Sequence, residues 1–190
     1  MSLIKKIDSI FLDRDGVINI DEGYTYKWSK FEFIEGAIEA LKHLKNLGKN
    51  LIIVTNQSGI ARGYYTEEDY LQLEAMMLDE MKSFGINILD VYHCPHHIDG
   101  AVPSLSIQCS HRKPSPGMIL SAIRDHGLDP SRSIIIGDKE SDIEAGENAK
   151  LAGKYLINPN HDIHELGSIA DAVYQSLYDF VKGTFELKND

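Results

Sequence analysis

The 190-residue sequence contains no apolar run of the roughly 18 residues that a membrane-spanning helix needs. The first residues, Met1 to Lys6, lack the apolar core and the small-residue cleavage site of a secretory signal peptide. Cysteine is rare as well: the chain has two, which in a cytosolic protein indicate a metal site or free thiols rather than a disulfide. These absences predict a cytoplasmic protein that does not enter a membrane.

Basic residues are outnumbered by acidic ones. Lysine and arginine total 19 against 29 aspartates and glutamates, which gives a net charge of −10 at pH 7. Because a nucleic-acid-binding surface needs a basic stripe, this charge argues against nucleic acid as a partner. The apolar fraction of 43% and the charged fraction of 25% are ordinary for a soluble globular protein. We therefore expect residues 1–190 to form a single domain with a substantial core, and a monomer is the default expectation.

Short apolar runs alternate with segments of helical periodicity. The predicted strands are Ile7–Leu12, Leu51–Thr55, Ile88–Tyr92, Ser133–Gly137 and Lys154–Ile157. The predicted helices are Glu35–Leu47, a helix opening at Thr66, a helix from Pro116 to Gly127, Ser141–Ala149 and Ala170–Val181. This alternation predicts a Rossmann-like α/β fold, in which helices cover both faces of a parallel sheet. Two long segments, 16–33 and 95–114, lack a regular pattern, and such loops are usually functional or disordered.

Two carboxylates follow the first predicted strand, in the run Asp13-Arg14-Asp15-Gly16. Open α/β sheets bind ligands at the carboxyl ends of their strands, so both acids lie where chemistry is expected. One carboxylate can attack an electrophile while the other transfers protons, and the two are close enough to share a cation. Taken alone, the same short motif is also compatible with a polar turn after a strand.

Three further polar motifs lie where other predicted strands end or helices begin. They are Thr55-Asn56-Gln57-Ser58-Gly59, Arg112-Lys113-Pro114 and Gly137-Asp138-Lys139-Glu140-Ser141-Asp142. In this order, and together with the motif at Asp13, they resemble the four motifs of the haloacid dehalogenase superfamily of phosphatases, across about residues 7–157. No insertion after Gly16 or Gly59 is large enough for a separate cap domain. We therefore expect loops to cover the site and to leave room for a small sugar phosphate.

The resemblance implies a role for the residues that would carry the reaction. Asp13 would be the nucleophile that forms an aspartyl-phosphate. Asp15 would protonate the leaving oxygen and then accept a proton from the hydrolytic water. Mg²⁺ would be held by the carboxylates of Asp13 and Asp138 and by the main-chain carbonyl of Asp15.

The resemblance also implies how the phosphoryl group would be held. The hydroxyl of Thr55 and the amide of Asn56 are hydrogen-bond donors for its oxygens, and Lys113 adds a compact positive charge. Asp142, one helical turn beyond Asp138, would orient Lys113 or a metal-bound water. The predicted catalytic residues are Asp13, Asp15, Thr55 and Lys113.

Cysteine and histidine side chains bracket the second irregular segment. These residues are Cys94, His96, Cys109 and His111. They form the pattern C-x-H-x12-C-x-H, and both residue types are the usual zinc ligands. A closed four-ligand zinc site would pin a loop of about residues 94–111 that has no core of its own. Two free thiols in a polar loop are the alternative, and His93 or His97 could replace His111 as a ligand.

This loop narrows the resemblance to one family. The run Cys-Pro-His-His at 94–97, the run 55–63 and Phe31-Glu32-Phe33 are similar to those of the bacterial heptose bisphosphate phosphatases. That family removes the C7 phosphate of D-glycero-D-manno-heptose 1,7-bisphosphate on the route to nucleotide-activated heptose, for lipopolysaccharide or other surface glycans. Its members usually carry Cys-x-Cys before Arg-Lys-Pro, whereas this chain has Cys109-Ser110-His111.

The substrate-binding residues are expected in the irregular segments and in the motifs around them. They are Asp21, Glu22, Gly23, Tyr24, Asn56, Gln57, Ser58, Arg112 and Lys139. Short acids and aromatic rings at 21–24 can hydrogen-bond to a sugar and stack on it, although Tyr24 and Trp28 could equally serve only to anchor the loop on the core. The planar guanidinium of Arg112, beside Lys113, suits the phosphate that is not hydrolysed.

Two other functions compete with this interpretation. Histidinol-phosphate phosphatases share the four motifs and a similar zinc loop, but that loop is generally shorter than the twelve residues between His96 and Cys109. A receiver-like module phosphorylated on Asp13 would be a signal rather than an enzyme. Asp15 argues against such a module, because a positioned acid and base promotes hydrolysis of the acyl-phosphate. The anomer preferred at C1 does not follow from the sequence.

Overall fold

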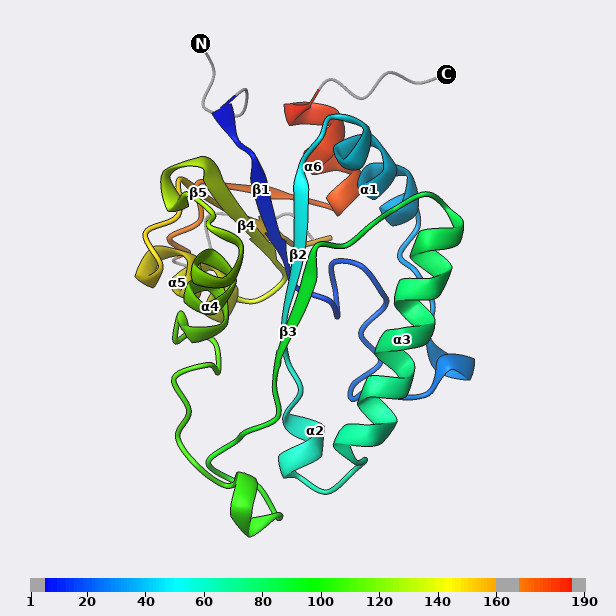
Figure 1. Ribbon diagram of the computed structural model, residues 1–190, viewed down its shortest axis with the longest axis vertical. Coiled ribbons are helices and arrows are strands. Elements are labelled where there is room, and N and C mark those ends of the chain that lie inside the picture. The colour runs from blue at the N-terminus through cyan, green and yellow to red at the C-terminus, as the bar shows by residue number, and fades with distance from the viewer. Residues whose placement is uncertain (1–5, 160–167, 186–190) are drawn as a thin grey trace.

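The computed structural model describes residues 6–159 and 168–185, which build an α/β fold on a parallel sheet (Figure 1). Six strands in these residues pair in the order β3-β2-β1-β4-β5-β6, and all neighbours are parallel. They are β1 (Ser9–Leu12), β2 (Asn50–Asn56), β3 (Asp90–Cys94), β4 (Ser133–Gly137), β5 (Gly153–Ile157) and β6 (Ala172–Tyr174). The strand order reverses between β1 and β4, so a ligand crevice is expected at their carboxyl ends.

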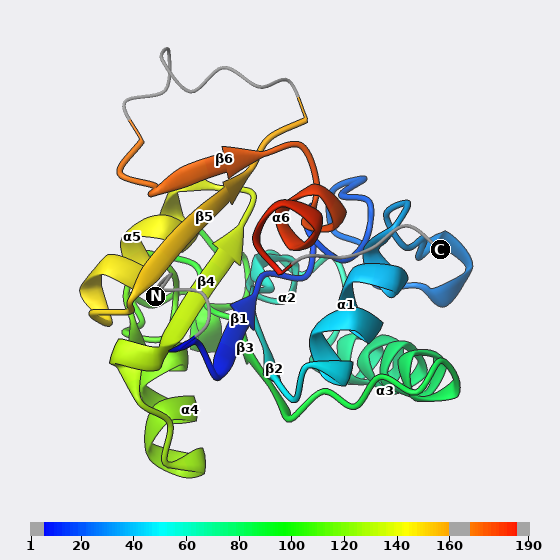
Figure 2. The ribbon, with the colours of Figure 1, turned by 90° about the horizontal axis from the view of Figure 1, so that it is seen from above.

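Helices cover both faces of the sheet, as Figure 2 shows from above. One face is covered by α1 (Ala37–Asn46), α3 (Glu67–Ser83) and α6 (Leu177–Thr184), and the other by α4 (Gly117–His126) and α5 (Glu140–Asn148). A short helix, α2 (Ser58–Ala61), follows β2, and 3-10 turns span Trp28–Lys30, Pro103–Leu105 and Pro130–Arg132.

The central strands are buried on both faces, and their side chains alternate between two apolar layers. Ile10 and Leu12 of β1 pack into the layer formed with α1, α3 and α6. Phe11 between them packs into the other layer with Met118 and Ile119 of α4. All three β1 side chains are fully buried. Burial on both faces explains why the strands read as continuous apolar runs rather than as alternating patterns.

The predicted Rossmann-like parallel sheet is confirmed, and most predicted helices lie where expected. Thr66 caps α3: its hydroxyl accepts a hydrogen bond from the Asp69 amide, and the Asp69 carboxylate accepts one from the Thr66 amide. Gly127 ends α4 in the left-handed conformation, with φ of 62°. Local capping chemistry therefore placed these helix ends correctly.

The predicted helix Ala170–Val181 is wrong in its first half. The structure has β6 there, and Val173 of this strand pairs with Leu156 of β5. The helix α6 begins only after Ser176, whose hydroxyl accepts a hydrogen bond from the Asp179 amide. A strand of three residues is too short to show a two-residue period, so its sequence gives no sign of pairing.

The predicted strand Ile88–Tyr92 is displaced by two residues, to β3 at Asp90–Cys94. In this register His93 pairs with Thr55, and Cys94 pairs with Asn56 at the end of β2. The displacement brings Cys94 to the carboxyl edge of the sheet, beside the motif that follows β2.

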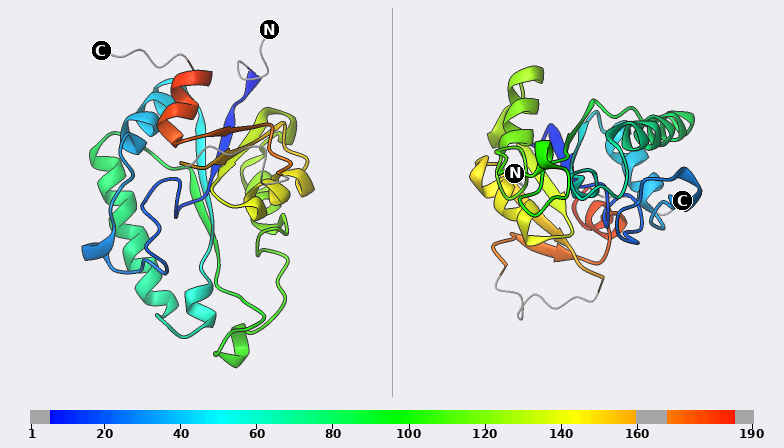
Figure 3. Two further views of the ribbon diagram at one scale, coloured as in Figure 1. Left: turned by 180° about the vertical axis from the view of Figure 1, so that it is seen from behind. Right: turned by 90° about the horizontal axis from the view of Figure 1, so that it is seen from below.

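Both irregular segments are loops at the carboxyl end of the sheet (Figures 1 and 3). In the segment 16–33, Trp28 stacks on Phe31 with ring centroids 5.2 Å apart, and both rings pack against the core. Trp28 therefore anchors this loop. In the described ranges neither segment contains a separate cap domain. No helix of the described residues is long and apolar enough to cross a membrane.

Candidate active site

A cavity of about 440 Å³ lies at the carboxyl ends of β1 and β2. Of the predicted catalytic and substrate-binding residues, all except Glu22 line it, and the Glu22 side chain is solvent-exposed. Tyr65 and Asp142 also line this cavity. Asp138, predicted as a metal ligand, borders a neighbouring cavity of about 570 Å³, and Asp21 lines both cavities. The strand-end motifs thus converge as the fold class requires.

Lys113 lies between two buried carboxylates at the base of the cavity. Its Nζ is 2.9 Å from Asp13 Oδ1 and 2.5 Å from Asp142 Oδ1, and it donates to the Val54 carbonyl at 2.7 Å. Burial alone would lower the pKa of Lys113, but the two carboxylates outweigh it and raise that pKa. Lys113 therefore stays a cation beside the predicted nucleophile.

Asp138 is the second carboxylate beside Asp13. Carboxylate oxygens of Asp13, Asp138 and Asp142 lie within 4.8 Å of one another. Burial, and then the charge of Asp13, raise the pKa of Asp138 to about 7. Asp138 Oδ1 is buried and has no hydrogen-bond partner in the described part of the chain. Gly16, with φ of 83°, permits this approach, since a Cβ there would overlap the Asp138 carboxylate.

These carboxylates suit a divalent cation. Asp13 is buried and Asp138 is partly buried, and close carboxylates with an unpartnered oxygen are the hard oxygen ligands that Mg²⁺ prefers. Asp142 is already engaged, because it binds Lys113 and its Oδ2 accepts a hydrogen bond from the Lys139 amide at the start of α5. Asp13 and Asp138 therefore have the freer oxygens, and Asp142 orients Lys113.

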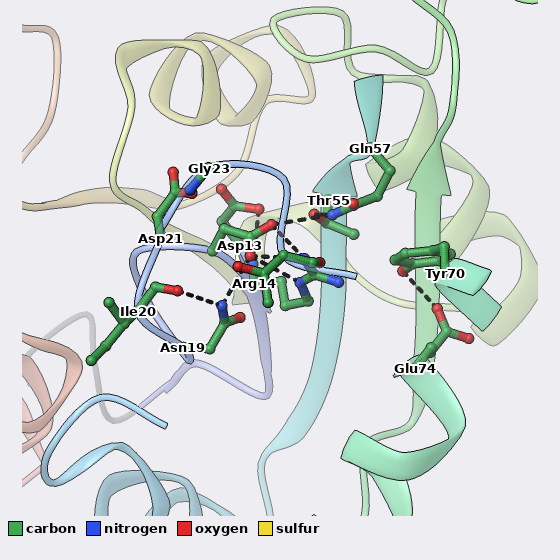
Figure 4. Close-up of polar contacts among 12 residues, drawn as sticks. Asp13, Arg14, Asn19, Ile20, Asp21, Gly23, Thr55, Gln57, Tyr70 and Glu74 are labelled. Carbon is green, nitrogen blue, oxygen red and sulfur yellow. Dashed lines mark hydrogen bonds and ion pairs between the residues drawn. The ribbon is translucent and has the colours of Figure 1, made fainter. Parts of the chain in front are cut away.

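The Asp15 carboxylate is held by donors on three side chains, those of Arg14, Asn19 and Gln57, which are labelled in Figure 4. Arg14 donates from Nε and Nη2 at 2.8–3.2 Å, Asn19 donates from Nδ2 at 3.0 Å, and Gln57 donates from Nε2 at 3.2 Å. Arg14 is itself buried: it also donates to the Thr25 carbonyl at 2.9 Å. Sequence reasoning missed Arg14 and Asn19, although an arginine between two acids was a usable signal.

Asn56 lines the cavity, and its side chain contacts the backbone of Lys113. Its Nδ2 donates to the Lys113 carbonyl at 3.1 Å, and its Oδ1 accepts from the Lys113 amide at 3.1 Å. This paired contact fixes the backbone of Lys113 and uses one of the two Nδ2 hydrogens of Asn56. Thr55 is 1% exposed and also lines the cavity.

The loop at 21–24 meets Lys139 across the mouth of the cavity. Lys139 Nζ lies 3.1 Å from Asp21 Oδ2 and 3.4 Å from Asp138 Oδ2. Asp21 Oδ1 accepts a hydrogen bond from the Gly23 amide at 2.9 Å, which shapes the loop. Tyr24 lines the cavity, and its ring meets the Tyr64 ring edge-on at 4.7 Å. This loop is therefore both a wall of the cavity and a self-supported structure.

Three of the four predicted zinc ligands come together. Cys94 Sγ, a His96 ring nitrogen and Cys109 Sγ lie within 4.8 Å of one another. Burial is the main cause that raises the pKa of Cys94 to about 11. The His111 ring is outside this cluster: its Nε2 is 3.3 Å from Ser121 Oγ, while its amide donates to Cys109 Sγ at 3.4 Å.

Neither alternative ligand completes the cluster. His93 Nε2 is 2.8 Å from a Glu67 carboxylate oxygen, and His97 Nε2 is 3.0 Å from Arg62 Nη2. Arg112 links the cluster to the cavity, because its Nη1 donates to the His96 carbonyl at 3.3 Å and its side chain lines the cavity wall.

Known proteins share both the sequence and the fold. A profile described as haloacid dehalogenase-like hydrolase matches residues 10–84, and a HAD-hydrolase-like profile matches residues 110–179. The D-glycero-alpha-D-manno-heptose-1,7-bisphosphate 7-phosphatase of Photorhabdus laumondii is 48% identical over 84% of this chain and 87% of its own length. The D-glycero-beta-D-manno-heptose-1,7-bisphosphate 7-phosphatase of Pasteurella multocida is 44% identical over 92% of this chain and 95% of its own.

A solved structure is similar along nearly the whole chain. The D,D-heptose 1,7-bisphosphate phosphatase from B. bronchiseptica, complexed with magnesium and phosphate, is 25% identical and has a TM-score of 0.82. The match covers 95% of this chain and 99% of that one. Since the two relatives are 48% and 44% identical over most of both chains, family membership follows. The chain belongs to the haloacid dehalogenase-like hydrolases and, within them, to the family of the heptose-1,7-bisphosphate 7-phosphatases.

Proposed function

We propose that this chain hydrolyses the C7 phosphate of D-glycero-D-manno-heptose 1,7-bisphosphate. The observation that carries the proposal is the placement of Asp13. Its buried carboxylate lies against Lys113 at the base of a cavity of about 440 Å³, and a second cation, Arg112, lines the wall of that cavity. Such a cavity has one set of groups for the phosphate that reacts and a separate guanidinium for the phosphate that stays.

In the first step Asp13 attacks phosphorus. A bond forms between an Asp13 carboxylate oxygen and phosphorus, and the bond from phosphorus to O7 of the sugar breaks. The departing oxygen needs a proton, which Asp15 supplies as general acid. Lys113 and the Thr55 hydroxyl stabilise the charge on the transferring phosphoryl oxygens.

In the second step water hydrolyses the aspartyl-phosphate. Asp15 now accepts a proton from the attacking water, a bond forms between water oxygen and phosphorus, and the bond to Asp13 breaks. Inorganic phosphate leaves, and both carboxylates return to their starting states. Asp142 positions Lys113 throughout, since it contacts the ammonium at 2.5 Å.

Mg²⁺ is the proposed cofactor of this reaction. The carboxylates of Asp13 and Asp138 and the main-chain carbonyl of Asp15 would hold it. When bound, it supplies positive charge that screens the repulsion between a phosphate monoester and the carboxylate nucleophile. Burial and the neighbouring Asp13 raise the pKa of Asp138, which supports the proposal because a cation relieves the crowding of these charges.

Zinc is proposed for the loop at 94–111. The support is the convergence of Cys94, His96 and Cys109 on one point. A fourth protein ligand requires the His111 ring to leave Ser121, and structural zinc sites usually have four. We further propose that residues 1–190 act as a single domain, as a monomer and in the cytoplasm.

Kinetics with three substrates test the proposed function. The α and β anomers of heptose 1,7-bisphosphate and histidinol phosphate should be compared at saturating Mg²⁺. We expect kcat/KM for one heptose anomer to exceed that for histidinol phosphate by at least two orders of magnitude. A preference for histidinol phosphate would refute the heptose assignment. A stable phosphoprotein without turnover would instead identify a phosphoacceptor module.

A further inference from the structure

One side-chain amide links the proposed general acid to the phosphoryl-binding hydroxyl. Gln57 is 2% exposed, and its Nε2 donates to Asp15 Oδ2 at 3.2 Å and to Thr55 Oγ1 at 2.8 Å. Arg14 and Asn19, which also hold Asp15, belong to the same loop as Asp15 itself. Gln57 follows β2 instead, so its hydrogen bond to Asp15 links the end of β2 to the segment that follows β1.

Tyr65 determines which way this amide faces. Its hydroxyl donates to Gln57 Oε1 at 2.7 Å. An ionised Asp15 only accepts hydrogen bonds, and in its protonated form the oxygen without the proton still accepts one, so the amide nitrogen faces Asp15 while the amide oxygen accepts from Tyr65. With both of its ends occupied, the Gln57 side chain has little capacity left for the sugar, although the sequence predicted that it binds substrate.

The fold supports Tyr65 on two sides. The ring of Tyr26 stacks on it with centroids 4.8 Å apart and an angle of 12° between the planes. Gly59 makes room for it, because a Cβ at that position would overlap the Tyr65 ring. Tyr65 is 6% exposed, and burial is the main cause that raises its pKa, so its hydroxyl keeps the proton that Gln57 accepts.

We propose that Gln57, oriented by Tyr65, is a positioning residue that holds Asp15 for proton transfer to the leaving group. The same amide donates to Thr55 Oγ1, which leaves the Thr55 hydroxyl proton free to point toward a phosphoryl oxygen. This inference rests on the proposed function, in which Asp15 protonates an alkoxide. It predicts that loss of the amide affects esters according to how much their leaving group needs a proton.

The test compares an alkyl phosphate with an aryl phosphate. The leaving group of heptose 1,7-bisphosphate is a sugar alkoxide, which needs a proton. The leaving group of 4-nitrophenyl phosphate is a stable phenolate, which does not. Asp15→Ala serves as the reference for complete loss of acid catalysis, which is worth about 10²–10⁴-fold. Tyr65→Phe and Gln57→Met keep the shape of each side chain and remove its hydrogen bonds. Tyr26→Phe is the matched control, since its hydroxyl makes none of these hydrogen bonds and its ring still covers Tyr65.

We expect Tyr65→Phe to lower kcat for the heptose ester about tenfold and Gln57→Met about tenfold to a hundredfold, with KM nearly unchanged. The corresponding loss of kcat for 4-nitrophenyl phosphate should be several times smaller, because its phenolate leaves without a proton. Some loss should remain, since any effect through Thr55 is common to both esters. In the Gln57→Met background, Tyr65→Phe should have no further effect on kcat, since it acts through the amide. Tyr26→Phe should retain the activity of the wild type on both esters.

Three results would overturn the inference. Equal losses on the two esters would show that the pair does not serve Asp15 in protonating the leaving group. A raised KM with unchanged kcat would show that Gln57 contacts substrate directly. Additive effects of Tyr65→Phe and Gln57→Met would show that they act separately. A wild-type protein that hydrolyses neither ester would refute the proposed function itself, and the inference with it, whereas a different preferred alkyl phosphate would replace the heptose ester in the same comparison.

Discussion

Replacement of Lys113 by methionine should cost the protein much of its stability. The Lys113 ammonium lies 2.9 Å from Asp13 Oδ1 and 2.5 Å from Asp142 Oδ1. These three residues are only 3%, 5% and 1% exposed, so water cannot replace the lost cation. Removing one partner of a buried ion pair typically costs about 3–5 kcal/mol, because the remaining charge is left uncompensated. For a chain of this size, 1 kcal/mol shifts Tm by about 2–4 °C, so Tm should fall by about 6–20 °C.

Thermal unfolding without Mg²⁺, followed by circular dichroism at pH 7.5, measures this effect. Lys113→Met keeps the apolar stem and removes the charge. Adding Asp142→Asn should recover part of the lost stability, since one of the two stranded charges is then gone. Mg²⁺ should stabilise Lys113→Met more than the wild type, because the ion can take over some of the missing charge. A Tm within about 2 °C of the wild type would refute the reasoning, since it would show that the ion pairs contribute almost nothing net.

Four further outcomes are expected. Asp13→Asn should reduce turnover by several orders of magnitude while the protein stays folded, and a loss of less than tenfold would exclude Asp13 as the nucleophile. The folded-state pKa of Asp138 is raised from 3.8 to about 7, so the metal-free protein should lose stability as pH rises from about 4 to about 7. Tm measured in EDTA should fall with pH over this range, and Asp138→Asn should abolish that fall. Arg112→Ala should lower kcat/KM about tenfold to a hundredfold for heptose 1,7-bisphosphate and hardly at all for the 7-monophosphate, as loss of a charge-assisted hydrogen bond predicts. Elemental analysis of the purified protein should find about one zinc per chain. Cys94→Ser should remove this zinc and lower Tm. A wild-type protein that is folded and active without zinc would exclude the site.

The fold was predictable because its main signals are local. Continuous apolar runs such as the one at β1 require burial on both faces, and they alternate with capped helices such as α3. The short strand β6 was missed, since its pairing with β5 depends on a tertiary contact of Val173 rather than on a pattern in three residues. The prediction of a helix or a strand was therefore correct where the sequence pattern was long enough to read, and it failed at the three-residue strand β6.

The site was predictable only in part, for a similar reason. Motifs at strand ends correctly brought Asp13, Thr55 and Lys113 together. Arg14 stands next to Asp15 in the sequence and could have been found, but the role of Tyr65 cannot be read from spacing, because it reaches Asp15 only through Gln57. In the same way, residue type suggested four zinc ligands, but the side-chain rotamer decides whether a histidine ring points toward the cluster. The His111 ring points toward Ser121 instead.

The central position of β1 has a consequence for how the two proposed catalytic carboxylates move. β1 lies between β2 and β4, and the Asp13 amide still donates to the Ile136 carbonyl at 3.0 Å. Backbone amides at this place should exchange with deuterium only when the whole domain unfolds. The loop 16–33 beyond Asp15 contributes no strand to the sheet, and its exposed turn at residues 20–24 should open locally and far more often. The nucleophile thus follows a strand that is protected on both sides, while the proton donor is followed by a loop whose exposed turn can open without disturbing that strand.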